Sequence, residues 1–590
     1  MLVYGDAVQR EPATTALARL RLAMQQVDTT APGLERHGRL TGLLIDAGML
    51  AQGFADAHFE RSGVDAAGIE EVTAMRLVMA LARCCAVSWN CSFAQTATLP
   101  WLELRACDHA ARDQWVEMRT PEGYAFYALY PESYLQAALR CRASVSDPAA
   151  PWRVIGLRSI GTSLSAMVAI ALGAPLPLTL RPTGPPFERH IQAEAPARLP
   201  DGCSVAIVDE GPGLSGSSMA AAMRWLAGSG SGVRPDQLHL FPSHGNGPGA
   251  HASDEVRRLW AQAPQWVSGF DASVLEAGDP AHRLSNWIAQ ALGPLDEPLQ
   301  DIGNGAWRKL QPTAASRPPS HPWQERRKYL AHASGRRWLA KFVGLGRRGV
   351  HAFERASALA AVGFCPEPVA FCHGFLVERW RDDMRPLSPQ LTPPLRSRFV
   401  AHLGAYLAFR ALRFPASSGS GASLLQLQAM ARHNTQEALG ATAAMAWQAR
   451  ESLAASLQAR VMPIETDSRL HAWEWLMQED RFLKTDAVDH HAAHDLVGCQ
   501  DVAWDVAGAT VELSLSDKEE LTLIGQLRAA GVRLDEDLLR FLNPCYLAFQ
   551  MGYFRMALDD SREADDRRPL EAARARYEAG LTRWIAKGAL

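Results

Sequence analysis

The sequence lacks a strong net charge, a dense set of cysteines and a long apolar run. Its 60 basic and 63 acidic residues leave a net charge of -3, so no global positive field draws the chain to nucleic acid or to an anionic membrane. The longest apolar run, Ala166 to Leu172, is far shorter than the roughly 20 residues of a membrane helix. The N-terminus also lacks the basic and apolar pattern of a signal peptide. We therefore expect a cytoplasmic protein that acts on small-molecule substrates, without nucleic-acid or membrane partners.

The ten cysteines are too sparse for a disulfide framework in 590 residues. Only one local group exists, and it lacks the paired CxxC spacing of a zinc site. We interpret this group as buried structural thiols rather than metal ligands. Its members are Cys84, Cys85, Cys91 and Cys107.

The chain is several times longer than a usual domain of roughly 150 residues, so we expect more than one domain. The segment patterns described next predict an α/β multidomain protein. Residues 1–118 are rich in Ala, Leu, Met and Arg at helical spacing, which predicts a helical N-terminal region. Residues 119–295 alternate apolar strands, Gly/Ser turns and helices, as parallel sheets do. After a Pro/Gly-rich boundary near 293–305, the strand-like segments WRKLQ, RKYLAHA and RRWLAKFVGL precede long helices in a third block, residues 303–590.

An apolar strand at residues 205–208 runs into Asp209 and Glu210 and then into a loop of small residues that opens a helix. Glycines let the backbone approach a ligand closely, and the free N–H groups of the helix start attract phosphate. The two carboxylates would repel that phosphate, so they suit a neighbouring diol or a bound Mg²⁺. The loop contributes Gly211, Gly213, Ser215, Gly216, Ser217 and Ser218.

This pattern resembles the phosphoribosyl-pyrophosphate motif of type I phosphoribosyltransferases, in which an apolar strand and two acids precede a Thr-Gly-x-Thr-like loop. Here the second acid is Glu210, and the loop is one residue longer than usual. The resemblance implies a phosphoribosyltransferase-like domain over residues 119–295 that moves the sugar from phosphoribosyl pyrophosphate to a nitrogenous acceptor with Mg²⁺. Asp209 and Glu210 would act in catalysis. The alternative is a Gly-rich helix start without a ligand.

A second strand and tight loop lie upstream, at residues 154–163. In the phosphoribosyltransferase family a loop at this place binds pyrophosphate, and Arg158, Ser159 and the amide near Gly161 are chemically suited to that role. A merely structural turn is the alternative. Further along, the Pro- and Gly-containing segment RPTGPPFERH predicts a mobile loop, in which Arg181, Arg189 and His190 are weaker candidates for holding pyrophosphate.

The third block places Lys341 in an apolar strand, where an unpaired ammonium is costly to bury. A helix with Glu354 follows, and then a strand that ends at Glu378 before a hinge-like segment. Kinase-like folds hold such a lysine with a helix glutamate and point it at nucleotide phosphates. The order resembles the N-terminal lobe of aminoglycoside phosphotransferase-like kinases, which implies ATP as a co-substrate. A surface Lys/Glu pair is the alternative.

Three acids follow at equal intervals: Asp467, Asp486 and Asp505. In the aminoglycoside phosphotransferase-like family the first orients the substrate hydroxyl, the second follows a β-hairpin and binds Mg²⁺, and the third anchors the loop. The sequence departs from the family because Glu465-Thr466-Asp467 replaces His-Gly-Asp and Ala472 replaces the expected Asn. Glu474 or His471 would then substitute as the second metal ligand.

A rival register makes Asp486 the catalytic acid and Asp495 the metal ligand, but nine residues leave too little room for a hairpin. We prefer the first register. We interpret His490, His491 and His494 as a polar loop rather than a metal site.

Together these patterns predict a bifunctional enzyme, with phosphoribosyl transfer joined to ATP-dependent phosphorylation of a hydroxyl. The altered catalytic loop supports a different class, a regulatory protein that binds phosphoribosyl pyrophosphate or nucleotide through a degenerate kinase domain. The helical N-terminal region would cap the transferase site or mediate a homodimer, and the sequence leaves both alternatives open.

Overall fold

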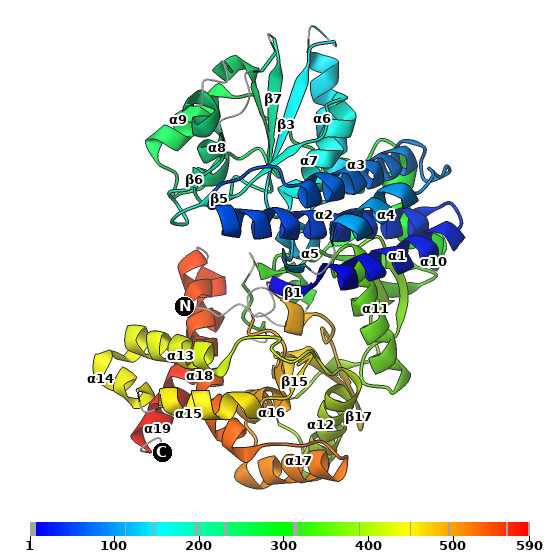
Figure 1. Cartoon of the computed structure of the whole chain (residues 1–590). Coiled ribbons are helices and arrows are strands. Elements are labelled where there is room, and N and C mark those ends of the chain that lie inside the picture. Colours follow the sequence, from blue (N-terminus) through cyan, green and yellow to red (C-terminus); the bar gives the residue numbers. More distant parts are fainter. Residues whose placement is uncertain are drawn as a thin grey trace.

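The structure, a computed structural model, has three regions that follow one another along the chain (Figure 1). The N-terminal helices lie between a parallel-sheet block above and a C-terminal block below in this view. The structure describes residues 8–587 apart from 112–113, 146, 148, 195–198, 201, 229–232, 311–316, 322–323, 389, 449, 494–495 and 562–563.

The N-terminal region is helical, as its composition predicts. Its longest helix, α2 (Leu34–Ser62), ends at Gly63, whose φ of 73° lets its N–H reach back to the Phe59 carbonyl. Helix α3 (Ile69–Asn90) is long and apolar enough to cross a membrane by length and composition, and 61% of its apolar window is buried within the fold. The remaining elements of this region are β1 (Val8–Pro12), α1 (Ala13–Thr29), α4 (Trp101–Ala110), β2 (Trp115–Arg119), which pairs with β1, and α5 (Glu122–Phe126).

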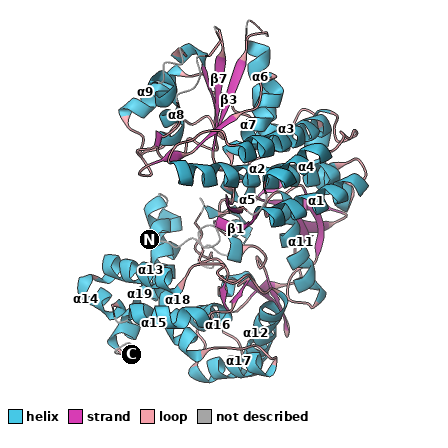
Figure 2. Ribbon diagram, viewed as in Figure 1, coloured by secondary structure: helices cyan, strands magenta, loops and turns pink. Residues whose placement is uncertain are grey.

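The second region contains the predicted parallel sheet, whose strands β3 and β7 are labelled in Figure 2. The strand order is β4-β3-β7-β8. Successive side chains of a strand face opposite sides, so Ala206 and Val208 of β7 join the core around α7, whereas Val205 and Ile207 pack with α8. The elements are α6 (Pro131–Ser144), β3 (Trp152–Leu157), α7 (Gly161–Leu172), β4 (Leu178–Leu180), β5 (Pro182–Thr183), β6 (His190–Ile191), β7 (Ser204–Val208), α8 (Ser217–Gly228), β8 (Leu238–Phe241), α9 (Asp254–Gln262) and α10 (Leu284–Leu292).

The C-terminal region has two lobes, a five-stranded antiparallel sheet and a mostly helical part. The sheet has the order β12-β13-β11-β10-β9, and α11 connects β11 to β12. The small lobe consists of β9 (Gln300–Asp301), β10 (Lys328–Ala333), β11 (Arg336–Phe342), α11 (Gly346–Ala361), β12 (Pro368–Cys372) and β13 (Phe375–Arg379).

The helical lobe carries the hairpin that the sequence predicts between Asp467 and Asp486, strands β16 and β17. Its elements are β14 (Arg385–Pro386), α12 (Pro393–Arg413), α13 (Leu424–Leu439), α14 (Ala441–Ala444), α15 (Arg450–Leu457), β15 (Pro463–Ile464), β16 (Trp475–Gln478), β17 (Arg481–Lys484), β18 (Gln500–Asp501), α16 (Val502–Glu512), α17 (Asp517–Ala529), α18 (Glu536–Asp560) and α19 (Ala564–Ala586).

One predicted strand of the C-terminal region is wrong. The segment WRKLQ does not extend a sheet, because residues 306–310 form a short 3-10 helix. Glu325 holds this turn, since its carboxylate accepts hydrogen bonds from the Gly305 amide at 2.9 Å and from the Trp307 indole at 2.8 Å. A long-range side-chain partner therefore overrides the local strand pattern.

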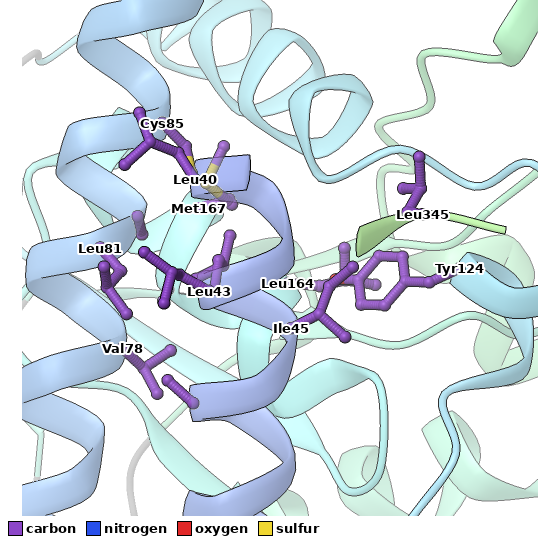
Figure 3. Close-up of a cluster of buried hydrophobic side chains, with 14 of the residues drawn as sticks. Leu40, Leu43, Ile45, Val78, Leu81, Cys85, Tyr124, Leu164, Met167 and Leu345 are labelled. Carbon is purple, nitrogen blue, oxygen red and sulfur yellow. The ribbon is translucent and has the colours of Figure 1, made fainter. Parts of the chain in front are cut away.

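One apolar core crosses the borders between the three regions (Figure 3). Leu43 of α2, Leu81 of α3 and Leu164 of α7 pack together in it, and Tyr124 lies beside Leu345 of the small lobe. The Leu345 amide also donates to the Tyr124 carbonyl at 3.0 Å. The boundaries expected at residues 118 and 295–303 remain predictions, and the regions that they separate share this core.

The contact between α2 and the start of α11 requires two glycines. Gly346 has a φ of 58°, and a Cβ on it would lie 2.7 Å from the Cα of Gly42. We expect Gly346→Ala to lower the free energy of unfolding by about 2–4 kcal/mol, the sum of left-handed strain and overpacking. Gly335→Ala is the matched control, since its φ is 68° and nothing lies within 4 Å. Denaturant unfolding measures both, and equal losses would show that the Gly42 contact contributes nothing.

Candidate functional site

A cavity of about 450 Å³ lies where the antiparallel sheet meets the helical lobe. The sheet, the loop before β16 and the segment after β17 all contribute to its wall. Its charged and aromatic lining suits a polar ligand with an apolar ring. The residues that matter below are Lys341, Glu378, Arg469, His471, Trp473, Glu474, Asp486, Asp489 and His490.

Lys341 is the buried cation of this cavity, as its apolar strand predicts. Strand β11 directs its ammonium at Asp486 and at Asp489, with 2.9 Å to the second carboxylate. Burial disfavours the charged ammonium, but the two carboxylates outweigh it and raise the pKa of Lys341. Lys341 is therefore a charged group that ties the small lobe to the helical lobe.

The predicted partner of Lys341 is wrong, because Glu354 is exposed on α11. The buried face of α11 is formed by Gly349, Ala352, Ala356 and Leu359, and helical geometry turns Glu354 away from it.

Arg355 shares the buried face of α11 instead, and sequence reasoning missed it. Its Nε lies 3.2 Å from a Glu465 carboxylate oxygen, and its guanidinium donates to His491 at 2.9 Å. The helical spacing of the apolar residues around Arg355 is the signal that would have found it.

Glu378 lies at the cavity, where the sequence predicts it. It stands at the end of β13 and is half-buried. Burial raises the pKa of Glu378 to about 7, and the nearby Asp486 and Asp489 add to the effect, while Lys341 opposes it.

The expectation that Asp467 faces a substrate is wrong, because this residue is fully buried and does not line the cavity. Its carboxylate accepts a hydrogen bond from the Tyr406 hydroxyl and lies 3.5 Å from Lys484 Nζ and 3.4 Å from His490 Nδ1. Burial opposes ionisation, but Lys484, His490 and Arg410 outweigh it and lower the pKa of Asp467. Asp467 is thus an ionised structural group.

Asp505 anchors the loop, as the kinase-like resemblance implies. Its carboxylate accepts hydrogen bonds from the backbone amides of Asp467 at 2.9 Å and Ser468 at 2.8 Å. The next residue, Arg469, is the first after this anchor to line the cavity, and its guanidinium bonds the Tyr553 hydroxyl. An arginine therefore stands where the sequence led us to expect a carboxylate.

The predicted metal ligands Asp486 and Glu474 both line the cavity but fall into different clusters. Ligand atoms of Asp486, Asp489 and His490 lie within 4.8 Å of one another, and so do those of Asp467, Glu474 and His490. Glu474 also accepts a hydrogen bond from Lys484 at 2.7 Å. Carboxylate oxygens are the ligands that Mg²⁺ prefers, so the chemistry of Asp486 and its neighbours fits that ion.

The polar loop that contains the histidines after Asp486 is packed inside the protein. His490 and His491 are buried, and the His490 ring contacts both Asp467 and Asp486. Burial lowers the affinity of His490 for a proton, but its bonds to the two carboxylates outweigh this and raise its pKa to about 9. His494 and Asp495, the metal ligand of the rival register, lie outside the described residues.

The second candidate site lies at the carboxyl edge of the parallel sheet. From β3 the chain continues to β4, the strand at one edge of the sheet. From β7 it continues in the opposite direction, to β8 at the other edge. Open parallel sheets bind ligands where the strand order reverses in this way. The loops after β3 and β7 flank this point because the two strands are neighbours. The tertiary structure thus brings the two predicted phosphate loops together.

Asp209 and Glu210 follow β7 at this point and are held by backbone amides. The Glu210 carboxylate accepts from the Gly123 amide at 3.0 Å, and the Asp209 carboxylate accepts from the Glu210 amide at 2.8 Å. Burial raises the pKa of Asp209 to about 7 and the pKa of Glu210 to about 8. A bound cation would stabilise the ionised form of these two acids, and a diol could donate hydrogen bonds to them.

The Gly/Ser loop leads from these acids into α8, which begins at Ser217. Ser215 and Ser217 are buried and hydrogen-bonded at 2.9 Å, whereas Gly213 is exposed. The amides of Gly249 and His251 donate to carbonyls of the loop, so the segment after β8 covers part of it. The remaining predicted residues are placed as expected on the loop or at the helix start, namely Gly211, Gly216 and Ser218.

The predicted pyrophosphate role of Arg158 is wrong. Its guanidinium is buried and paired with Asp56 at 2.8 Å and with Asp65, both from the N-terminal region. Arg181 pairs with Asp56 as well. Arg158 therefore joins the N-terminal helices to the sheet, a role that depends on carboxylates about a hundred residues away.

Ser159 and Gly161 stay beside the switch point. Gly161 begins α7, and a Cβ there would lie 2.7 Å from the Val208 carbonyl oxygen. This glycine therefore allows the helix to pack closely on β7, whatever ligand the loop binds.

The cysteine group is mostly buried, as expected. Cys84, Cys85 and Cys107 are buried free thiols, while Cys91 is half-buried. Burial raises the pKa of Cys84 to about 11 and the pKa of Cys107 to about 12, which makes these two thiols poor nucleophiles.

The chain matches no protein-family model and no curated protein. Among solved structures, choline kinase LicA from Streptococcus pneumoniae matches 43% of this chain over 89% of its own length, with 13% identity and a TM-score of 0.30. Macrolide 2'-phosphotransferase MphH from Brachybacterium faecium matches 49% of this chain over 96% of its own length, at 16% identity and a TM-score of 0.31. Spectinomycin phosphotransferase, solved with ADP and spectinomycin, matches 50% over 93%, at 11% identity and a TM-score of 0.34.

The C-terminal region has two lobes, the linking helix α11, a lysine on β11 and a loop anchored by Asp505. This is the arrangement that the resemblance to aminoglycoside phosphotransferase-like kinases leads us to expect.

We expect Asp467→Asn to lower the free energy of unfolding by roughly 3 kcal/mol, because it removes one of the two carboxylates that compensate each of the buried cations Lys484 and His490. Asp480→Asn is the matched control, since its pair with Arg398 is exposed and worth at most about 1 kcal/mol. Thermal and denaturant unfolding measure both variants. An Asp467→Asn protein as stable as the wild type would return this residue to a substrate-facing role.

Proposed function

We propose that the kinase-like region binds a magnesium nucleotide in its cavity, with Lys341 against the phosphates and Asp486 on the metal. The observation that carries this proposal is the ion pair between the buried Lys341 and the half-buried Asp486 at the junction of the lobes. A lysine on the sheet and an aspartate after the hairpin are the phosphate and metal ligands of kinase-like nucleotide sites. Trp380, which lines the same cavity after β13, offers an apolar surface to the base.

Metal and nucleotide should bind this site together. Nucleotide phosphates alone would take Lys341 away from Asp486 and bring negative charge towards that carboxylate. Mg²⁺ alone would take Asp486 and leave the buried ammonium of Lys341 with one carboxylate fewer. The two ligands together replace both halves of the broken ion pair, so each should raise the affinity for the other.

Phosphoryl transfer through Asp467 does not fit the position of that residue, which supports binding without turnover as the function of this region. Arg469 instead places a cation at the cavity, where it would hold phosphate charge and cannot accept a hydroxyl proton. The regulatory alternative to a bifunctional enzyme thus has a specific residue in its favour. A search for transfer from ATP to candidate hydroxyl compounds distinguishes the two, and sustained turnover would favour the enzyme.

We expect Asp486→Asn and Lys341→Met each to weaken magnesium-ATP binding at least tenfold, about 1.4 kcal/mol. Isothermal titration of the full chain with ATP, with and without Mg²⁺, measures this. Glu354→Gln is the matched control, since Glu354 is exposed and the cavity does not include it. Equal affinities in the wild type and the three variants would contradict the proposed site. An affinity for ATP that does not change with Mg²⁺ would also contradict it.

We propose a second function for the parallel-sheet region, the binding of phosphoribosyl pyrophosphate with Mg²⁺. The two half-buried acids after β7 support it, because a ribose diol or a metal would compensate them, and the start of α8 faces the same edge. Transfer of the sugar to a nitrogenous acceptor is the finer part of this proposal. Arg158 is not available for pyrophosphate, so other groups must hold it there.

The double variant Asp209→Asn, Glu210→Gln should lower the affinity for magnesium phosphoribosyl pyrophosphate at least tenfold, since it removes both carboxylates from the switch point. Titration calorimetry on the full chain measures this affinity. The exposed Asp236→Asn is the control. Unchanged affinity in the double variant would contradict the role of the two acids. If the wild type does not bind phosphoribosyl pyrophosphate, only the proposed nucleotide site remains.

A further inference from the structure

A buried cluster of His37, Glu132 and His373 joins the three regions of the molecule. His37 lies on α2, Glu132 on the first turn of α6, and His373 in the turn between β12 and β13 of the kinase-like sheet. All three are buried, and Glu132 is completely shielded from solvent. One ligand atom from each lies within 4.8 Å of the other two.

The ordinary hydrogen bonds of the fold leave this cluster incomplete. One carboxylate oxygen of Glu132, Oε1, accepts a hydrogen bond from the Thr41 hydroxyl at 3.0 Å and lies 3.0 Å from His37 Nε2. The other oxygen, Oε2, has no hydrogen-bond partner among the described residues. Both ring nitrogens of His373 likewise lack one in the described part of the chain. Buried polar atoms without a partner cost free energy, so each needs an explanation.

We propose that this cluster binds one zinc ion. Two histidines and one glutamate form a known zinc ligand set. Zinc bonds of about 2.0–2.1 Å separate tetrahedral ligand atoms by about 3.3 Å. The distances from the Glu132 oxygen to the Nε2 atoms, 3.0 Å for His37 and 4.0 Å for His373, lie on either side of that value.

The surroundings orient His37 toward the cluster. Its Nδ1 lies 3.1 Å from the Ser88 hydroxyl, the kind of outer contact that orients a ligating histidine and leaves Nε2 directed at Glu132.

The ion would act as a staple between distant parts of the chain. His37 and Glu132 are 95 residues apart, and the neighbouring contact from Tyr130 to the His373 carbonyl spans 243 residues. Cross-links that close such long loops restrict the unfolded chain most. The zinc site would therefore stabilise the docking of the kinase-like sheet onto the N-terminal helices and α6.

Elemental analysis of the full, tag-free chain after incubation with zinc and desalting tests the site. We expect about one zinc per chain in the wild type and at least a tenfold lower content in His373→Gln and Glu132→Gln. His282→Gln is the matched control, because His282 is buried and stacks on Trp89 of the same core, but bonds the Trp89 carbonyl at 2.9 Å. Equal zinc contents in the wild type and His373→Gln would overturn the proposal.

A second measurement does not depend on the folding of any variant. Removal of zinc from the wild type with a chelator should lower its melting temperature, and restored zinc should recover it, since a ligand that binds only the folded state stabilises it. Cobalt added to the stripped protein should give the visible absorption of a tetrahedral site. Stripped wild type that binds neither metal would overturn the proposal.

Discussion

The arrangement of the kinase-like region depends on the compensation of one buried charge. The Lys341 ammonium sits in an apolar strand, where it is tolerable only with carboxylates beside it. Those carboxylates, Asp486 and Asp489, come from the other lobe, so the same requirement that stabilises the lysine also brings the lobes together. The cavity forms at the place where they meet.

The same physical rule explains the other long-range contacts of the chain. Arg158 is compensated by Asp56 and Asp65, which fastens the N-terminal helices to the parallel sheet. Asp467 is compensated by Lys484 and His490. In each case a charged residue that looked catalytic in sequence has a structural role, because its partners are far away along the chain and close in space.

The three regions share one apolar core and are not separate domains joined by linkers. The apolar core of Figure 3 runs from α2 and α3 through α7 to Leu345. The cluster of His37, Glu132 and His373 lies within the same junction. Packed contacts therefore connect the lobe that carries the cavity with the parallel-sheet region.

The sequence alone determined the features that depend on local pattern. Strand and helix alternation indicated the parallel sheet, and the Gly/Ser loop after Asp209 and Glu210 marked the start of a helix. The hairpin before Asp486 was expected from the resemblance to aminoglycoside phosphotransferase-like kinases. It also identified Lys341 as a buried cation and Asp505 as an anchor, since an apolar strand and a short motif suffice for both.

Only the tertiary structure decided which charges meet. Glu354 turns outward because the apolar face of α11 fixes the rotation of that helix, and Arg355 takes the inward place. Asp505 sets the loop so that Asp467 is buried and Arg469 reaches the cavity. Burial, helix phase and ion-pair partners are properties of the packed chain, so single-sequence spacing could not determine them.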